Sequence, residues 1–205
     1  RIRGHAEIGR QAWLRAKWRF LHESSSLSGR TKHIHLKNLR LKDEMKYKVK
    51  LSKNINLINK KFSKNEFYHY IDEPNNSLLI PIFKKKFLIV MQKRIPINQS
   101  NYEFPMGWVD KGESPQNASS RELLEETGYK SLIKPKKLMQ FYADPGRGNR
   151  SCFCYFSNKL IKVNKPEKKI KIFLKSAKEI EKLIKNKKFN NSLHIAAFYY
   201  FMYKH

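Results

Sequence analysis

The sequence predicts an α/β domain over residues 45–205, and three observations support that fold class. First, several short segments rich in Ile, Leu, Phe, Tyr and Val alternate with Asn, Pro, Lys or Asp, a pattern typical of successive strands. Second, one later segment carries the start and stop residues of a helix. Third, further strand-like and helix-like segments follow it. A chain of 205 residues is long enough for one domain of ordinary size and an extension.

The elements are expected in the following order along the chain. Early strands are predicted near residues 55–62, 66–71, 77–83 and 87–93. A helix of about three turns comes next, because Ser114 is a good N-cap, Pro115 suits the first helical position and Gly128 suits the left-handed residue after a helix. Later strands are predicted near 132–143, 150–157 and 169–174, and two helices near 176–187 and 191–203.

The formal net charge of +27 would, taken alone, indicate a polyanionic partner such as nucleic acid. After residue 45, however, the basic residues are 29 Lys and 4 Arg, accompanied by many Asn and Ile. Scattered lysines form a solvated surface more often than a binding stripe. We therefore do not expect nucleic-acid binding as the main function.

Residues 1–44 differ in composition from the remainder of the chain. They hold 7 Arg, 4 Lys and four of the seven histidines, and they show little of the alternation typical of strands. We interpret them as a loosely ordered or non-native basic extension that precedes the domain of residues 45–205. A basic arm with a binding role is the alternative.

Neither a membrane segment nor a secretion signal is expected from the sequence. The apolar runs fall short of the roughly 18–20 residues of a membrane span, and no stretch near the N-terminus combines a basic segment, an apolar segment and a cleavage site. A cytoplasmic location is the expectation. Cys152 and Cys154 alternate in a predicted strand and form no known disulfide or zinc pattern, so we expect them to be reduced and packed.

Three glutamates of the predicted helix stand at positions i, i+3 and i+4. Glu122, Glu125 and Glu126 therefore lie on one helical face, where their charges repel. A bound divalent cation explains such clustering, and carboxylate oxygens suit Mg²⁺ or Mn²⁺. A solvated acidic surface is the alternative for three glutamates considered alone.

The residues around these glutamates follow a longer pattern. Gly107 is followed by Glu113, by Arg121 with Glu122, and by Gly128, with the spacing of the Nudix box complete at its charged and glycine positions. The sequence is thereby identified as resembling the Nudix hydrolase family. The resemblance implies an α/β/α sandwich with a mixed, curved sheet.

The same resemblance implies roles for the box residues. Gly107 would allow a tight turn, and Glu122, Glu125 and Glu126 would bind the metal ion. Arg121 would orient a box carboxylate through a salt bridge, and Glu113 would be structural. Either Glu125 or Glu126 would serve as the general base, since the base varies between family members.

Three flanking segments resemble the subgroup that hydrolyses ADP-ribose and related nucleoside-diphosphate sugars. Gln92-Lys93-Arg94 and Glu103-Phe104-Pro105-Met106-Gly107 lie upstream of the box. In such relatives the carbonyl of the residue at Met106 contacts the metal ion. Arg94 would bind a substrate phosphate, and an ordinary surface residue at the end of a strand is the alternative. Downstream, the loop with Pro145, Gly146 and Arg147 would contact the substrate, although a Pro-Gly pair is also an ordinary turn.

One departure from this subgroup concerns its additional acidic loop. The matching region here is rich in lysine, and Glu167 is its only acid, so Glu167 is a further candidate for the general base. The resemblance also implies a homodimer with residues 50–72 at the contact. We expect Mg²⁺-dependent hydrolysis of ADP-ribose or an ADP-sugar. The alternatives are another substrate, such as a nucleoside triphosphate, a dinucleoside polyphosphate or NADH, and a non-catalytic sensor that binds a ligand or nucleic acid.

Overall fold

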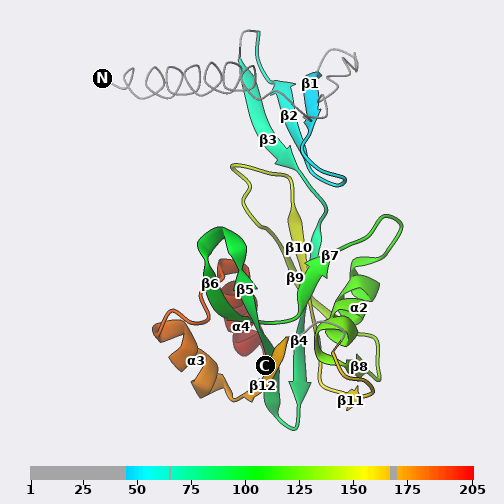
Figure 1. The fold of residues 1–205 in the computed structure, drawn as a ribbon, viewed down its shortest axis with the longest axis vertical. Coiled ribbons are helices and arrows are strands. Elements are labelled where there is room, and N and C mark those ends of the chain that lie inside the picture. The colour runs from blue at the N-terminus through cyan, green and yellow to red at the C-terminus, as the bar shows by residue number, and fades with distance from the viewer. Residues whose placement is uncertain (1–44, 65, 167–169) are drawn as a thin grey trace, which may run out of the picture. The chain divides into compact units, whose positions relative to one another are not determined.

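Figure 1 shows the computed structural model, which describes residues 45–64, 66–166 and 170–205. The predictions made for residues 1–44 and for Glu167 lie outside these described residues. In the part that is described, no helix is both long enough and apolar enough to cross a membrane.

The main sheet has the strand order β12-β5-β4-β10-β9, with β6 paired to β5 and β7 paired to β4. Strands β4 and β10 are parallel, and the other pairs are antiparallel, so the sheet is mixed, as predicted. Its strands are β4 (Asn76–Phe83), β5 (Lys86–Arg94), β6 (Gln99–Glu103), β7 (Met106–Trp108), β9 (Lys136–Tyr142), β10 (Ser151–Ser157) and β12 (Lys171–Lys175).

Both faces of this sheet are covered by helices, because successive residues of its central strands point to opposite sides. On β4, Leu78 and Ile80 belong to a core cluster with residues of α3 (Ala177–Lys185) and α4 (Ser192–Lys204). Leu79, between them in the sequence, belongs to a second cluster, with Leu123 of α2 (Pro115–Thr127). Figure 1 shows α2 on one side of the strands and α3 and α4 on the other. The predicted α/β/α sandwich is confirmed.

Helix α2 has the ends that the sequence predicts. The Ser114 hydroxyl accepts a hydrogen bond from the backbone N–H of Asn117 at 3.2 Å, and Pro115 occupies the first helical position. Gly128 ends the helix with a φ of 70°, in the left-handed region that favours glycine. These local signals fix where α2 begins and ends.

Smaller sheets complete the described elements. A three-stranded sheet has the order β1-β2-β3 within these residues, and a second pairing joins β8 to β11. Their bounds are β1 (Met45–Lys50), β2 (Asn56–Lys61), β3 (Phe67–Asp72), β8 (Tyr129–Ser131) and β11 (Leu160–Lys162). A 3-10 turn, η1, spans Ile95–Ile97. The prediction missed β1, β6, β7, β8, β11 and this turn.

The two cysteines lie side by side on β10. Cys152 and Cys154 are both buried and free, with their sulfur atoms 4.0 Å apart. The hydrogen bond with Cys152 and then burial raise the pKa of the Cys154 thiol, which therefore stays protonated. The prediction that both are packed is confirmed.

His194, a residue of α4, is polar and fully buried in the core. Its Nδ1 accepts a hydrogen bond from the backbone N–H of Phe104 at 3.0 Å, so the ring proton lies on Nε2. That Nε2 is 3.5 Å from a carboxylate oxygen of Glu103. Burial of the imidazole lowers the pKa of His194 to about 4. A neutral histidine thus joins the last helix to the turn before β7.

Gly128→Ala is expected to destabilise the fold by more than about 2 kcal/mol, because a left-handed Ala costs about 1 kcal/mol or more and its methyl group would clash. An ideal Cβ at this position lies 2.0 Å from the backbone oxygen of Asn164. Urea unfolding measures the change. Gly112→Ala is the matched control, because Gly112 has a φ of 83° but nothing within 4 Å of its Cβ position. Equal losses in both variants would contradict the steric argument.

His194 is expected to make stability depend on acid pH. Its folded pKa of about 4 lies below the ordinary value of 6.5, so the unfolded chain binds a proton that the folded chain does not. The stabilisation is therefore fully present above pH 6.5 and is lost as the pH falls toward 4, by up to about 3 kcal/mol. Glu103 and Arg94 are the charged groups that act on the ring, in opposite directions.

The test compares urea unfolding of the wild type and His194→Asn between pH 7 and pH 4.5. Asparagine retains an acceptor near the position of Nδ1 but does not titrate. The wild type should lose stability more steeply than the variant on acidification. Parallel curves would show that His194 does not carry the dependence.

Candidate functional site

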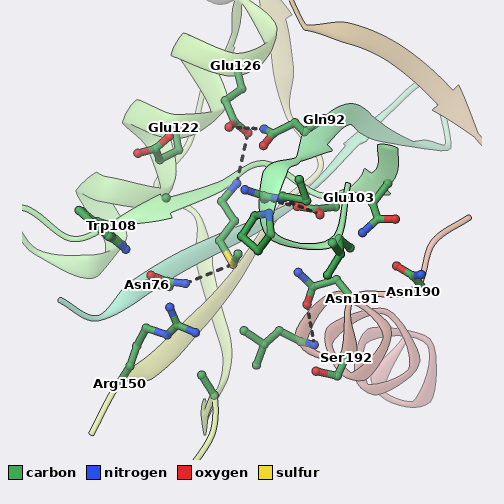
Figure 2. A pocket seen from close by; sticks show the side chains of 18 of the residues that line it. Asn76, Gln92, Glu103, Trp108, Glu122, Glu126, Arg150, Asn190, Asn191 and Ser192 are labelled. Carbon is green, nitrogen blue, oxygen red and sulfur yellow. Dashed lines mark hydrogen bonds and ion pairs between the residues drawn. The ribbon is translucent and has the colours of Figure 1, made fainter. Parts of the chain in front are cut away.

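A cavity of about 1070 Å³ opens between helix α2, the ends of several strands and the start of helix α4 (Figure 2). Its walls combine polar and apolar surface in similar amounts and hold both acids and bases. The side chains come from α2 (Arg121, Glu122, Glu126), from β4 to β7 (Asn76, Gln92, Arg94, Asn101, Glu103, Met106, Trp108), and from the start of α4 and the residues before it (Asn190, Asn191, Ser192, Leu193).

Glu122 lies against the backbone of strand β7. Glu122 is only 6% exposed, and a Cβ added at Gly107 would lie 1.9 Å from Oε1 of Glu122. The glycine is therefore required by the close approach of this carboxylate. The prediction of a tight turn at Gly107 is wrong, because Gly107 lies inside β7 and pairs with Ser77 of β4.

Glu126, one helical turn further along α2, is 3% exposed. Its Oε1 accepts a hydrogen bond from Nε2 of Gln92, and its Oε2 lies 3.4 Å from the backbone N–H of Met106 (Figure 2). Strand β5 and strand β7 thus both donate to this carboxylate. Met106 itself lines the cavity.

Arg121 connects the acids of the box. Its Nε and Nη2 donate to the two carboxylate oxygens of Glu113 at 3.1 and 3.0 Å, and its Nη1 donates to Glu122 at 2.8 Å. Nη2 also donates to the carbonyl of Trp108 at 2.8 Å. These carboxylates raise the pKa of Arg121, and the bond from Arg121 lowers the pKa of Glu113. The guanidinium therefore stays charged and holds the loop before α2 to the helix.

Glu113 and Glu125 lie beside the cavity without lining it, as far as the described residues show. Glu113 also accepts a hydrogen bond from the backbone N–H of Asp110 at 3.2 Å, which closes the loop before α2. Glu125 is a quarter exposed and has an oxygen 3.4 Å from Nη1 of Arg121. Glu125 thus shares this nitrogen with Glu122, but only Glu122 and Glu126 line the cavity.

The donor set suits a hard divalent cation. Two buried carboxylates one turn apart line the cavity, and oxygen donors of this kind bind Mg²⁺ or Mn²⁺. Among the described residues, however, no group of three or more His, Cys, Asp or Glu side chains converges as a ready-made metal cluster. The residues fit a cation whose remaining ligands are the backbone, water or the substrate.

Arg94 lines the cavity as the end residue of β5, where its guanidinium is held by the buried Glu103. Nε donates to Oε1 of Glu103 at 3.0 Å, and Nη2 pairs with Oε2. This bond raises the pKa of Arg94. The carboxylate thus fixes the direction of the guanidinium and offsets its charge.

The loop with Pro145, Gly146 and Arg147 does not line the cavity in the described structure. It is bound instead to strand β3: the hydroxyl of Tyr68 donates to the Gly146 carbonyl at 2.6 Å, and the N–H of Ile71 donates to the Arg147 carbonyl at 2.8 Å. The side chain of Arg147 is exposed. Its role in substrate binding stays a prediction.

Several cavity residues were missed by the sequence reasoning. They are Asn76, Asn101, Trp108, Arg150 and the segment Asn190–Leu193. Most belong to no pattern with a fixed spacing, because strand pairing and helix packing bring them together. The start of the last helix was predicted, but nothing in the sequence indicated that it faces the box.

Comparison with known proteins agrees with this geometry. The sequence model of the NUDIX domain matches residues 74–188. An ADP-ribose pyrophosphatase of Bacillus subtilis is 36% identical over 75 residues, which are 37% of this chain and 40% of the relative. An ADP-sugar pyrophosphatase of Mus musculus is 38% identical over 79 residues, which are 35% of this chain and 34% of the relative. These matches thus span less than half of either relative.

A solved structure described as an ADP compounds hydrolase has a similar fold, with a TM-score of 0.63. The similarity covers 76% of this chain and 88% of that structure, at 16% sequence identity. At that identity the similarity concerns the fold. The domain match, in contrast, covers more than half of the chain and includes the entire box. This chain therefore belongs to the Nudix family.

Proposed function

We propose that this protein hydrolyses the diphosphate bond of ADP-ribose or an ADP-sugar, with a divalent cation, to give AMP and a sugar phosphate. The observation that carries the proposal is the pair Glu122 and Glu126, buried one turn apart on α2 and facing a cavity of about 1070 Å³. A cavity of this size accommodates a nucleoside diphosphate derivative. We propose Mg²⁺ as the cation, with Mn²⁺ as the substitute.

Glu122 and Glu126 would hold the cation, together with the carbonyl of Met106. When bound, a divalent cation neutralises charge on the diphosphate and lowers the pKa of a coordinated water. Gln92 and the N–H of Met106 orient the carboxylate of Glu126, and Arg121 orients that of Glu122. The protein thus supplies acids whose directions are fixed before the substrate arrives.

Hydrolysis requires a water oxygen to attack one phosphorus atom while the bond from that phosphorus to the bridging oxygen breaks. The attacking water transfers a proton to a base, and the bridging oxygen leaves on the other phosphate. We propose Glu126 as the base in preference to Glu125, because Glu126 lines the cavity. Glu167, the other candidate, lies outside the described residues.

The choice of ADP-ribose or an ADP-sugar rests on two supports. The relatives from Bacillus subtilis and Mus musculus carry these substrates in their names. Arg94, held in the cavity by Glu103, supplies a guanidinium for a substrate phosphate. A nucleoside triphosphate, a dinucleoside polyphosphate and NADH are the alternative substrates that a panel of compounds would separate.

We also propose a homodimer in the cytoplasm, with residues 50–72 at the contact between copies. Phe62 and Tyr68 in this region have exposed aromatic rings, which supports an interface there. Light scattering measures the mass in solution. A monomer at all concentrations would contradict this part of the proposal.

Purified protein with Mg²⁺ is expected to release AMP from ADP-ribose, and Glu126→Gln should lower kcat at least about a hundredfold. Chromatography of the products measures both. Glu181→Gln, on an exposed residue of α3, is the matched control and should retain activity. Full activity in Glu126→Gln would remove Glu126 from the proposed site. No AMP from any compound of the panel would support the non-catalytic sensor.

Gly107→Ala is expected to lower kcat by a similar factor while the fold remains stable. The new methyl group must displace the carboxylate of Glu122, which is the flexible end of a side chain, so the backbone need not move. Activity and the melting temperature are measured together. A stable variant with unchanged kcat would show that the position of Glu122 against β7 does not matter for the reaction.

A further inference from the structure

Three cavity residues stand in a row across neighbouring strands. On one side of β4, Asn76 pairs with Trp108 of β7. On its other side, Asn76 pairs with Cys152 of β10, and Arg150 lies two residues before that cysteine. The antiparallel pairing of β9 and β10 continues to this point, since the N–H of Ala143 donates to the Arg150 carbonyl at 3.0 Å.

The register places the three side chains on one face of the sheet. Directly paired residues share a face, and so do residues two apart on one strand. Trp108, Asn76 and Arg150 therefore all point to the side of Leu78 and Cys152, which lie together in one core cluster. All three line the cavity, and Figure 2 shows them along one of its walls. We name Trp108, Asn76 and Arg150 the polar row.

Arg150 keeps one nitrogen that has no acceptor among the described residues. Its Nη1 lies 3.2 Å from a carboxylate oxygen of Glu73, so its charge is already offset. Its Nε is buried and has no hydrogen-bond partner among the described residues. Buried donors are normally paired with protein, water or ligand. A hydroxyl oxygen of a ligand can accept a hydrogen bond from this Nε.

Asn76, in contrast, requires a hydrogen-bond donor from the ligand. Its Nδ2 lies 3.8 Å from the sulfur of Met106, and because a thioether only accepts hydrogen bonds, this contact fixes the direction of the amide. Its Oδ1 is buried and, within the described part of the chain, has no partner. An acceptor of this kind needs a donor, which an ionised phosphate lacks and a hydroxyl group has.

Trp108 adds an apolar surface to the row. The residue is 39% exposed, so part of the indole ring faces the cavity. Such a surface packs against the C–H face of a sugar ring. A donor, an acceptor and an aromatic surface side by side therefore match a sugar with free hydroxyl groups.

The position of the row fits the sugar next to the reacting diphosphate. Trp108 directly follows Gly107, against which the Glu122 carboxylate lies. Neighbouring strands are about 4.8 Å apart, so the row extends about 10 Å from that point, the span of a sugar ring and its substituents. We propose that the polar row binds the hydroxyl groups of a sugar joined to the diphosphate, an inference that rests on the proposed function.

The test measures the affinity for ADP-ribose by calorimetric titration in EDTA, which prevents turnover. Arg150→Lys retains a positive charge for Glu73 but removes the Nε donor, and it should weaken binding at least about tenfold. Asn76→Leu removes the acceptor and should weaken binding similarly. Lys178→Gln, which changes an exposed residue of α3, is the control and should bind as the wild type does. Thermal unfolding checks that each variant is folded.

Two analogues identify the sugar. One lacks the hydroxyls of the terminal sugar, and the other lacks the 2′ and 3′ hydroxyls of the adenosine. If the row binds hydroxyls, Arg150→Lys should not weaken the binding of one of these analogues. The sugar that lacks its hydroxyls in that analogue is then the one that the row binds. An equal penalty with ADP-ribose and both analogues, or no penalty in either folded variant, would overturn the proposal. So would a wild type that does not bind ADP-ribose.

The two proposals fail in different ways. If the wild type binds ADP-ribose through its hydroxyls but releases no AMP with Mg²⁺, the hydrolase proposal fails and the polar row stands. If AMP is released but neither row variant distinguishes the analogues, the polar row fails and the hydrolase proposal stands. If Arg150→Lys does not fold, Asn76→Leu decides with the same analogues.

Discussion

The arrangement of the site depends on the hydrogen bonds that the guanidinium of Arg121 donates. Clustered acids on one face of a helix repel one another, and a single fixed cation offsets that cost. Arg121 is bound to Glu113 in the loop before the helix, to Glu122 on the helix, and to the Trp108 carbonyl on the adjacent strand. One side chain therefore ties loop, helix and sheet together. Its bond to Glu122 helps to hold that carboxylate against β7.

The sequence was informative wherever a structural signal is local. The ends of α2 follow from Ser114, Pro115 and Gly128, which act within one helical turn of the backbone they cap. The β6 strand was missed because its residues, Gln99–Glu103, are almost all polar. Strand β7 has three residues, too few to show alternation, and exists because it pairs with β4. Tertiary pairing, which no local pattern records, decides such elements.

The same distinction applies to the site. Glu122 and Glu126 could be identified because helical spacing places them on one face and the fixed spacing of the box residues around them indicates a metal site. The packing of Gly107 against Glu122 could not be anticipated, since it depends on how closely α2 approaches β7. Asn76 and Arg150 are 74 positions apart in the numbering of this chain, and the parallel register of β4 and β10 brings them to one wall. Only the paired strands reveal that relation.

The hydrogen bond between Phe104 and His194 has a consequence for the order of folding. It joins residues 90 positions apart, so the turn before β7 obtains this partner only when the last helix has docked. Until then the amide of Phe104 must remain hydrated, and Glu103 cannot be enclosed as it is in the finished domain. A ribosome-bound chain that has not yet released α4 would hold the box helix without a completed cavity. Docking of α4 is thus the step that closes the site.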